Sequence, residues 1–199
     1  MAKNKIYFKY GTMFSGKTLN LISTVKTYEH NKQTVLILKP AQDTRDKGII
    51  KSRMSTETLN CVTFDKDEDL GVLFLKFKDL KPDIIFIDEV QFCTEKQIEQ
   101  LHDLSKFAPI MCYGLKTSYT GDLFPSIAKL MAIAEDIQEI KTVCSMCKSK
   151  ATHNLLLVDG NPTYLGTQIN VENTASNEVY KAVCREHFYE PKLGGLNGE

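Results

Sequence analysis

The sequence predicts an α/β protein in which parallel strands alternate with helices, followed by a small unit of another kind. Short runs of β-branched and aromatic residues alternate with helical patterns, and a glycine-rich loop separates the first run from the first helical pattern. Helical periodicity disappears after Cys144. Strands that alternate with helices pair in parallel through right-handed crossovers, so we expect a parallel sheet with helices in the first part of the chain.

The expected parallel sheet contains four buried strands, because four short runs are rich in apolar residues that favour strands. These runs are Ile6–Phe8, Val35–Leu38, Ile84–Ile87 and Ile110–Tyr113. Three helices are also expected: one that begins at Lys17, one over Glu95–Phe107 and one around Ile127–Ala134. Residues 42–64 are polar and weakly patterned, and we expect loops there.

The organisation of the chain changes near residue 141. Beyond it, the short alternating runs Leu155–Val158 and Ile169–Val171 lie among expected turns at 159–160, 161–162 and 173–177. We therefore predict a nucleotide-binding α/β domain over 1–143, a smaller domain over 144–192 and a disordered tail over 193–199.

Composition excludes several classes of protein. The chain has 199 residues, 42% of them hydrophobic, and its 25 Lys and Arg balance its 25 Asp and Glu. This profile is not that of a disordered chain, nor of a protein with the basic excess typical of nucleic-acid binding. The first residues are too weakly apolar for a secretory signal, and no segment is long enough to span a bilayer. We expect a cytoplasmic protein with no membrane or nucleic-acid partner.

A phosphate-binding loop follows the first expected strand. Residues 11–18 fit GxxxxGK[ST] and lie between a predicted strand and a predicted helix, as this motif requires. Backbone N–H groups would surround a phosphate of ATP, Lys17 would reach the β- and γ-oxygens, and Thr18 would offer its hydroxyl to Mg²⁺. The alternative is a glycine-rich turn with an ordinary surface lysine. The expected loop residues are Gly11, Thr12, Met13, Phe14, Ser15, Gly16, Lys17 and Thr18.

The second half of such a site is a hydrophobic strand that ends in an acid. Asp88 follows Ile84–Ile87 and would hold Mg²⁺ directly or through water. Glu89 would lie beside the γ-phosphate, where it could take a proton from an attacking hydroxyl or orient a water. We extend the expected nucleotide site to Val90 and Gln91. The alternative is that both acids only terminate the strand.

Two ligand pairs in the second unit predict a zinc site. Cys144 and Cys147 form one C-x-x-C pair, and Cys184 and His187 form a C-x-x-H pair. Each spacing lets one tight turn place two side chains on a tetrahedral ion. Four protein ligands leave no position for an activated water, so the zinc should be structural. A redox C-x-x-C or a disulfide is the alternative, and the second pair disfavours both. Three other cysteines are expected as free thiols: Cys61, Cys93 and Cys112.

The motifs together resemble one family, the thymidine kinases of the cellular, zinc-containing class (type II). The similar segments occur in the expected order and together span about nine tenths of the chain, and DEVQF, GLxxxYxGxLF and the terminal Y-x-x-V-C are far more specific than the phosphate loop. They are GTMFSGKT at 11–18, LKPAQDTR at 38–45, IDEVQF at 87–92, YGLKTSYTGDLFPS at 113–126, LMAIAEDI at 130–137, CSMC at 144–147 and EVYKAVCREHF at 178–188.

The resemblance implies a P-loop NTPase (RecA-like) parallel sheet and a zinc-bound lasso that closes over thymidine. It implies that Glu89 deprotonates the 5′-hydroxyl and that Arg45 lies near the phosphates with Lys17. It further implies that thymine is read largely by main-chain groups of the lasso, that the enzyme is a homotetramer, and that thymidine triphosphate inhibits it. The side chains that would surround the nucleoside are Met13, Phe92, Leu115, Tyr119 and Tyr180.

The chain departs from the family pattern at four places. Cys93 stands where a second aromatic is frequent, residues 52–54 read Ser-Arg-Met rather than the frequent Ser-His pair, and His187 replaces a frequent fourth cysteine. Histidine is an equally valid zinc ligand. Residues 171–177 are longer than the usual lasso turn and lack glycine, so the lasso over 165–177 differs from the family pattern.

Three functions follow from these features. The leading hypothesis is transfer of the γ-phosphate of ATP to thymidine. Another deoxynucleoside kinase or a simple ATPase would share residues 11–18 and 88–89 but differ in the acceptor. A zinc-ribbon nucleic-acid-binding module on an ATP-dependent scaffold is disfavoured, because acidic residues offset the basic ones in residues 144–199.

Overall fold

A six-stranded parallel sheet forms the centre of the molecule. The computed structural model describes residues 4–43, 48–166 and 177–194. All neighbours in the sheet are parallel, in the order β5-β2-β6-β7-β1-β8. Its strands are β1 (Ile6–Tyr10), β2 (Val35–Pro40), β5 (Val62–Phe64), β6 (Ile84–Ile87), β7 (Ile110–Gly114) and β8 (Asp136–Glu139). This order places the carboxyl ends of β6 and β1 on either side of the end of β7.

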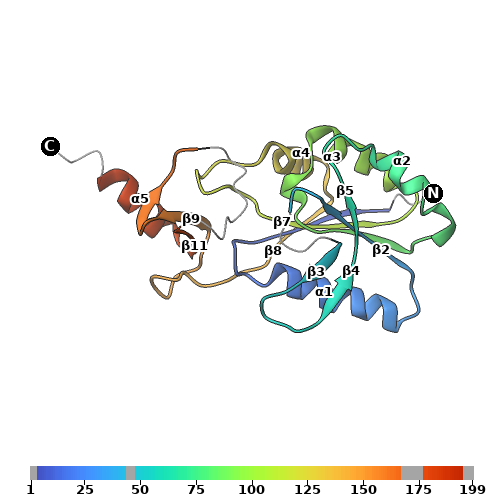
Figure 1. Ribbon diagram of the computed structural model, residues 1–199, viewed down its shortest axis with the longest axis horizontal. Helices are drawn as coiled ribbons and strands as arrows, with labels where there is room; N and C mark the ends of the chain where they lie inside the picture. Colours follow the sequence, from blue (N-terminus) through green and yellow to red (C-terminus); the bar gives the residue numbers. More distant parts are fainter. Residues whose placement is uncertain (1–3, 44–47, 167–176, 195–199) are drawn as a thin grey trace.

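Helices cover both faces of this sheet (Figure 1). One face carries α1 (Lys17–His30) and the antiparallel pair β3 (Ile49–Lys51) and β4 (Thr58–Asn60). The other carries α2 (Leu70–Leu75), α3 (Glu95–Leu104) and α4 (Pro125–Ile133), with short 3₁₀ turns η1 (Lys78–Leu80) and η2 (Val90–Phe92).

Both faces of the sheet are buried because its strands are almost continuously apolar. Successive residues of β6 alternate between two cores: Ile85 and Ile87 pack on the side of α2, α3 and α4, whereas Ile84 and Phe86 pack on the side of α1. All four side chains are fully buried. The centre of the sheet is therefore a rigid support for whatever follows the end of β6.

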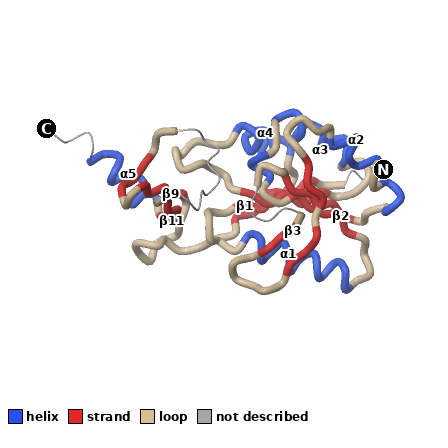
Figure 2. The backbone as a smooth tube through the Cα atoms, viewed as in Figure 1, coloured by secondary structure: helices blue, strands red, loops and turns tan. Residues whose placement is uncertain are grey.

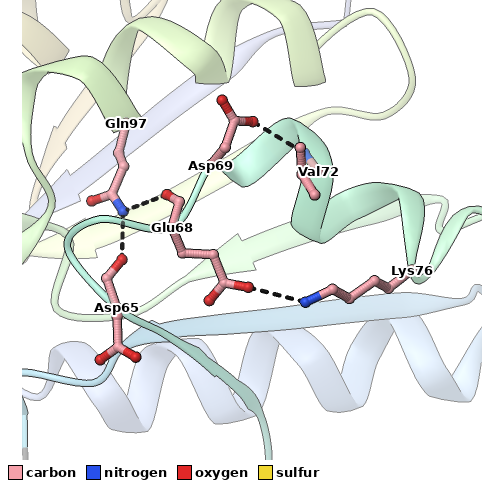
Figure 3. Close-up of polar contacts among 6 residues, drawn as sticks. All are labelled: Asp65, Glu68, Asp69, Val72, Lys76 and Gln97. Atoms are coloured by element: carbon pink, nitrogen blue, oxygen red, sulfur yellow. Dashed lines mark hydrogen bonds and ion pairs between the residues drawn. The ribbon is translucent and has the colours of Figure 1, made fainter.

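Polar side chains fix the short helices on one face (Figure 3). The carboxylate of Asp69 accepts from the N–H of Val72 and caps α2, and the buried Gln97 of α3 donates to the carbonyls of Asp65 and Glu68. Thr94 and Gln97 also form a reciprocal capping box at the start of α3. These bonds hold the loop before α2 against α3.

A second, smaller sheet carries the C-terminal part of the chain (Figure 2). It is antiparallel, in the order β10-β9-β11, and α5 follows it. Its elements are β9 (His153–Val158), β10 (Asn161–Thr163), β11 (Glu178–Val183) and α5 (Arg185–Gly194). Below, residues 4–142 are called the parallel-sheet region and residues 143–194 the cysteine–histidine region.

The predicted α/β class and its parallel sheet are confirmed. All four predicted strands are present, and α1 begins at Lys17 as expected. The second predicted helix ends at Leu104 rather than Phe107, and the third covers 125–133. The expectation of loops over 42–64 is incomplete, because the described part of this region holds loops together with three short strands, β3, β4 and β5.

Two expectations for the C-terminal part are wrong. Asn161-Pro162 begins β10 instead of forming a turn, and proline is tolerated there because β10 is an edge strand. A helix, α5, follows β11 and includes Leu193 and Gly194, which we expected in the tail. The turn at Asp159-Gly160 is confirmed by positive φ at both residues. The predicted run Ile169–Val171 and residues 195–199 lie outside the described residues. Within the described ranges, no helix is both long and apolar enough to cross a lipid bilayer.

Candidate functional site

The loop between β1 and α1 has the backbone of a phosphate cradle. Gly16 has a φ of 85° and Phe14 a φ of 60°, so both lie in the left-handed region. A Cβ on Gly11 would lie 2.4 Å from Ser15 Oγ and 2.5 Å from the carbonyl oxygen of Ile140. Glycine at position 11 is therefore required by close packing, and glycine at position 16 by its φ.

The polar groups of this loop suit a bound phosphate. Lys17 is nearly buried at the start of α1, and its Nζ donates to the carbonyl of Thr12 over 2.8 Å. The hydroxyls of Thr12 and Ser15 are buried and have no hydrogen-bond partner among the described residues. Buried hydroxyls rarely stay unpaired, and a helix N-terminus attracts anions. The residues present therefore fit the phosphates of ATP.

Two lysines affect the pKa of Asp88, the acidic residue that directly follows β6. Asp88 is 4% exposed, and burial together with the charge of Glu89 raises its pKa to about 7, whereas Lys39 and Lys17 oppose that rise. Lys39 also forms a buried ion pair with Asp43, with 2.9 Å between Nζ and Oδ2. These interactions bring the start of α1 and the ends of β2 and β6 into one electrostatic site, where a divalent cation would stabilise the Asp88 carboxylate.

Glu89 is held in an unusual conformation directly after Asp88. Its φ of 51° and ψ of 41° are left-handed, which costs energy for a residue with a Cβ. Its carboxylate accepts from Nε2 of Gln91 over 2.6 Å. The side-chain oxygen of Gln91 in turn accepts from the N–H of Leu115 over 3.0 Å. Ser126 Oγ donates to the main-chain carbonyl of Gln91. The buried Gln91 thus links Glu89 to the segment that follows β7.

Three of the residues expected around the nucleoside lie in one cluster between the two regions. Tyr119 and Tyr180 meet edge to face with ring centroids 6.3 Å apart, and Met13 packs against the same cluster. The hydroxyl of Tyr119 donates to the carbonyl of Leu165. The phosphate loop and β11 therefore contribute to one apolar, aromatic surface.

The other expected site residues are placed differently. Leu115 is joined to Glu89 through Gln91, and Phe92 is half-buried at the end of η2, three residues after Glu89. Arg45 and residues 167–176 of the expected lasso lie outside the described residues, so their predicted contacts stay predictions.

The four predicted zinc ligands meet. Their ligand atoms lie within 4.8 Å of one another. Cys147 Sγ and Cys184 Sγ are 3.8 Å apart, and His187 Nδ1 lies 3.2 Å from Cys184 Sγ and 3.6 Å from Cys144 Sγ. A tetrahedral zinc with Zn–S bonds of about 2.3 Å separates its sulfurs by roughly 3.8 Å. The chemistry and spacing of this donor set therefore suggest zinc binding.

Backbone N–H groups around the cysteines also suggest zinc binding. The N–H of Met146 donates to Cys144 Sγ and that of Ser149 to Cys147 Sγ. Such N–H groups stabilise a thiolate, the form of cysteine that binds zinc. An isolated bridge between Val143 and Lys150 closes the turn that presents both cysteines.

Four residues that sequence reasoning did not single out contribute to the site. Lys39 and Asp43 form the buried pair beside Asp88, and the motif LKPAQDTR contains both. Arg53 belongs to the Ser-Arg-Met segment that departs from the family pattern, and its Cζ lies 5.0 Å from the ring centroid of Phe14. Asn154 accepts from the N–H of Met13. No local sequence signal marks Asn154, because its partner lies 141 residues away.

Comparison with known proteins places these features in a family context. A family model described as thymidine kinase matches residues 4–188. A thymidine kinase of Streptococcus pyogenes serotype M3 is 35% identical over 195 residues, which cover 95% of this chain and 99% of that protein. A thymidine kinase of Streptococcus agalactiae serotype Ia is similar to the same extent.

Proposed function

The chain belongs to the thymidine kinase family and phosphorylates thymidine with ATP, and we propose that Glu89 is the proton acceptor of this reaction. The observation that carries the proposal is the position of Glu89 directly after Asp88, with its carboxylate oriented by the buried Gln91. A base must be held within reach of the proton that it removes.

The proposed reaction is an in-line transfer. The 5′-oxygen of thymidine attacks the γ-phosphorus of ATP, the bond from that phosphorus to the β,γ-bridging oxygen breaks, and ADP leaves. Glu89 receives the proton of the 5′-hydroxyl. Lys17 and the N–H groups of residues 16–18, at the start of α1, stabilise the charge on the phosphate oxygens, and Arg45 adds to them.

Mg²⁺ is part of the proposal. Thr18 and Asp88 would hold it, and it would neutralise charge on the β- and γ-phosphates. The raised pKa of Asp88 supports this assignment, because a bound cation would offset the cost of burying that carboxylate.

The nucleoside is proposed to bind between the two regions. Met13, Tyr119 and Tyr180 would form its apolar surroundings, together with Phe92 and Leu115. Zinc would hold the cysteine–histidine region in place without taking part in the reaction; its ligands would be Cys144, Cys147, Cys184 and His187. We further propose a cytoplasmic homotetramer that thymidine triphosphate inhibits.

The substitution Glu89→Gln tests the assigned base. Glutamine keeps the size of the side chain but cannot accept the proton, so kcat should fall by about 10²–10⁴-fold, while the Kd for ATP stays within about twofold. Steady-state phosphorylation of thymidine and calorimetric titration with ATP measure the two effects. Glu29→Gln, at an exposed position on α1, is the matched control. Full activity in Glu89→Gln would exclude this residue as the base.

A panel of nucleosides tests the acceptor. Thymidine should be phosphorylated and deoxycytidine should not, and little ATP should be hydrolysed when no nucleoside is present. ATP turnover that is independent of nucleoside would contradict the proposed use of the site.

A further inference from the structure

A single buried amide joins three segments that are distant in sequence. Asn154 lies on β9 and is 3% exposed. Its Oδ1 accepts from the N–H of Met13 over 2.7 Å, and its Nδ2 donates to the carbonyl of Thr117 over 3.1 Å. One partner can only donate and the other can only accept, so the orientation of the amide is determined by its partners.

Both partners of Asn154 belong to the parallel-sheet region and lie in segments of the site. Met13 is part of the phosphate loop, and its N–H is committed to Asn154 in this structure. Thr117 precedes Ser118 and Tyr119, and Tyr119 contacts Tyr180. The position of one side chain therefore sets the spacing between the phosphate loop and the segment that carries Tyr119.

The backbone of Asn154 is tied to the metal cluster. In the β9–β11 pair Asn154 lies opposite Ala182, two residues before Cys184. The carbonyl of Ala182 accepts from the N–H of Ser145, which follows Cys144. A change in the position of Cys144 or Cys184 would therefore be transmitted to β9 through only a few hydrogen bonds.

We infer that Asn154 is a positioning residue that couples the cysteine–histidine cluster to the phosphate loop. It acts through Met13 and Thr117 rather than on the substrate. The inference rests on the proposed roles of residues 11–18 and of the zinc ligands. Its consequence is that the state of the metal site affects the binding of ATP, although no zinc ligand belongs to the nucleotide site.

Hydrogen exchange at the Met13 amide tests this coupling directly. Removal of zinc from the wild-type chain by a chelator should speed exchange at Met13 about tenfold, because the bond to Asn154 weakens. The amide of Ile85, which donates to Pro109 inside the parallel sheet, is the internal control and should not change. Unchanged exchange at Met13 after zinc removal would overturn the inference.

Variants separate coupling from a merely structural role. Asn154→Ala should speed Met13 exchange about tenfold with zinc still bound, whereas Asn154→Asp keeps the acceptor and should keep Met13 protected. Asn161→Leu, at an exposed position on neighbouring β10, is the matched control and should behave as the wild type. If Asn154→Ala does not fold, the wild-type comparison with and without zinc still decides the question.

The second measurement is the Kd for ATP, by calorimetry without nucleoside. Zinc removal should weaken ATP binding about tenfold in the wild type, but should have no further effect in Asn154→Ala, in which the link is already broken. An equal effect of zinc in both proteins would contradict the inference. Failure of the proposed function would instead appear as a wild-type chain that exchanges as described but does not phosphorylate thymidine.

Discussion

The parallel-sheet region and the cysteine–histidine region are stabilised in different ways. The first has two large cores of aliphatic and aromatic side chains, one on each face of the sheet. Among the described residues, the second has a core cluster of five buried residues, and two of them, Cys144 and Cys184, are proposed zinc ligands. The other three are Leu155, Val183 and Phe188.

This difference indicates what each region can do alone. A core as large as that of the parallel sheet supports folding by burial, whereas a few dozen residues with a small core need a cross-link such as a metal. The proposed phosphate-binding groups belong to the parallel-sheet region, and Tyr180 belongs to the region whose fold we propose to depend on zinc. We therefore expect nucleoside binding to depend on zinc much more strongly than nucleotide binding does.

The largest effect should come from loss of the metal. Cys147→Ala should unfold the cysteine–histidine region while the parallel sheet stays folded, because structural zinc contributes on the order of 10 kcal/mol to small domains. Hydrogen exchange monitored by mass spectrometry should show loss of protection over 143–194 first. Cys61→Ala, which removes a thiol of the parallel-sheet region, is the control. Simultaneous loss of protection in both regions would contradict the comparison.

A smaller effect should appear within the parallel-sheet region, at Asp88. Its folded-state pKa of about 7 lies above the ordinary 3.8, so between these pH values the folded chain holds a proton that the unfolded chain has released. Stability therefore falls as pH rises from about 4 to 7, by up to roughly 4 kcal/mol. The substitution Asp88→Asn removes this destabilisation, because asparagine carries no charge.

The urea midpoints of wild type and Asp88→Asn, without Mg²⁺ or nucleotide, measure that effect. The variant should gain more stability over the wild type at pH 8 than at pH 5, because the wild-type carboxylate is charged only at the higher pH. The same gain at both pH values would show that the charge of Asp88 does not oppose folding.

The smallest effect is expected at Gln91, which orients Glu89. Gln91→Leu leaves the proposed base present but without its hydrogen bond, so kcat should fall roughly 10–100-fold with little change in the KM for ATP. Gln91→Glu should not restore activity, since it places a second carboxylate beside Glu89. A proportional loss of folded protein and of activity would indicate a structural role alone.

Much of the fold follows from residue pattern. Apolar strands such as Ile84–Ile87 are evident because both of their faces are buried, and the phosphate loop is evident because its glycines are required by backbone geometry. The ligand pairs near Cys144 and Cys184 are evident because their spacing reflects one tight turn each. Local chemistry alone marks these features.

Other features depend on partners distant in sequence. The strand Asp136–Glu139 is largely polar because it lies at the sheet edge, where β1 is its one partner among the described strands, and β3 and β4 are too short to show a pattern. The roles of Asn154 and of the Gln91–Leu115 contact arise only when separate segments meet. Pattern reasoning has no access to such contacts.

Binding of thymidine and of ATP to the chain with and without zinc tests the central claim most directly. Calorimetric titrations of both ligands, each with zinc bound and after chelation, give four values of Kd. We predict that removal of zinc weakens thymidine binding more than about 100-fold and ATP binding only about tenfold. Equal weakening of both ligands, or thymidine binding that survives without zinc, would contradict the division of the site between the two regions.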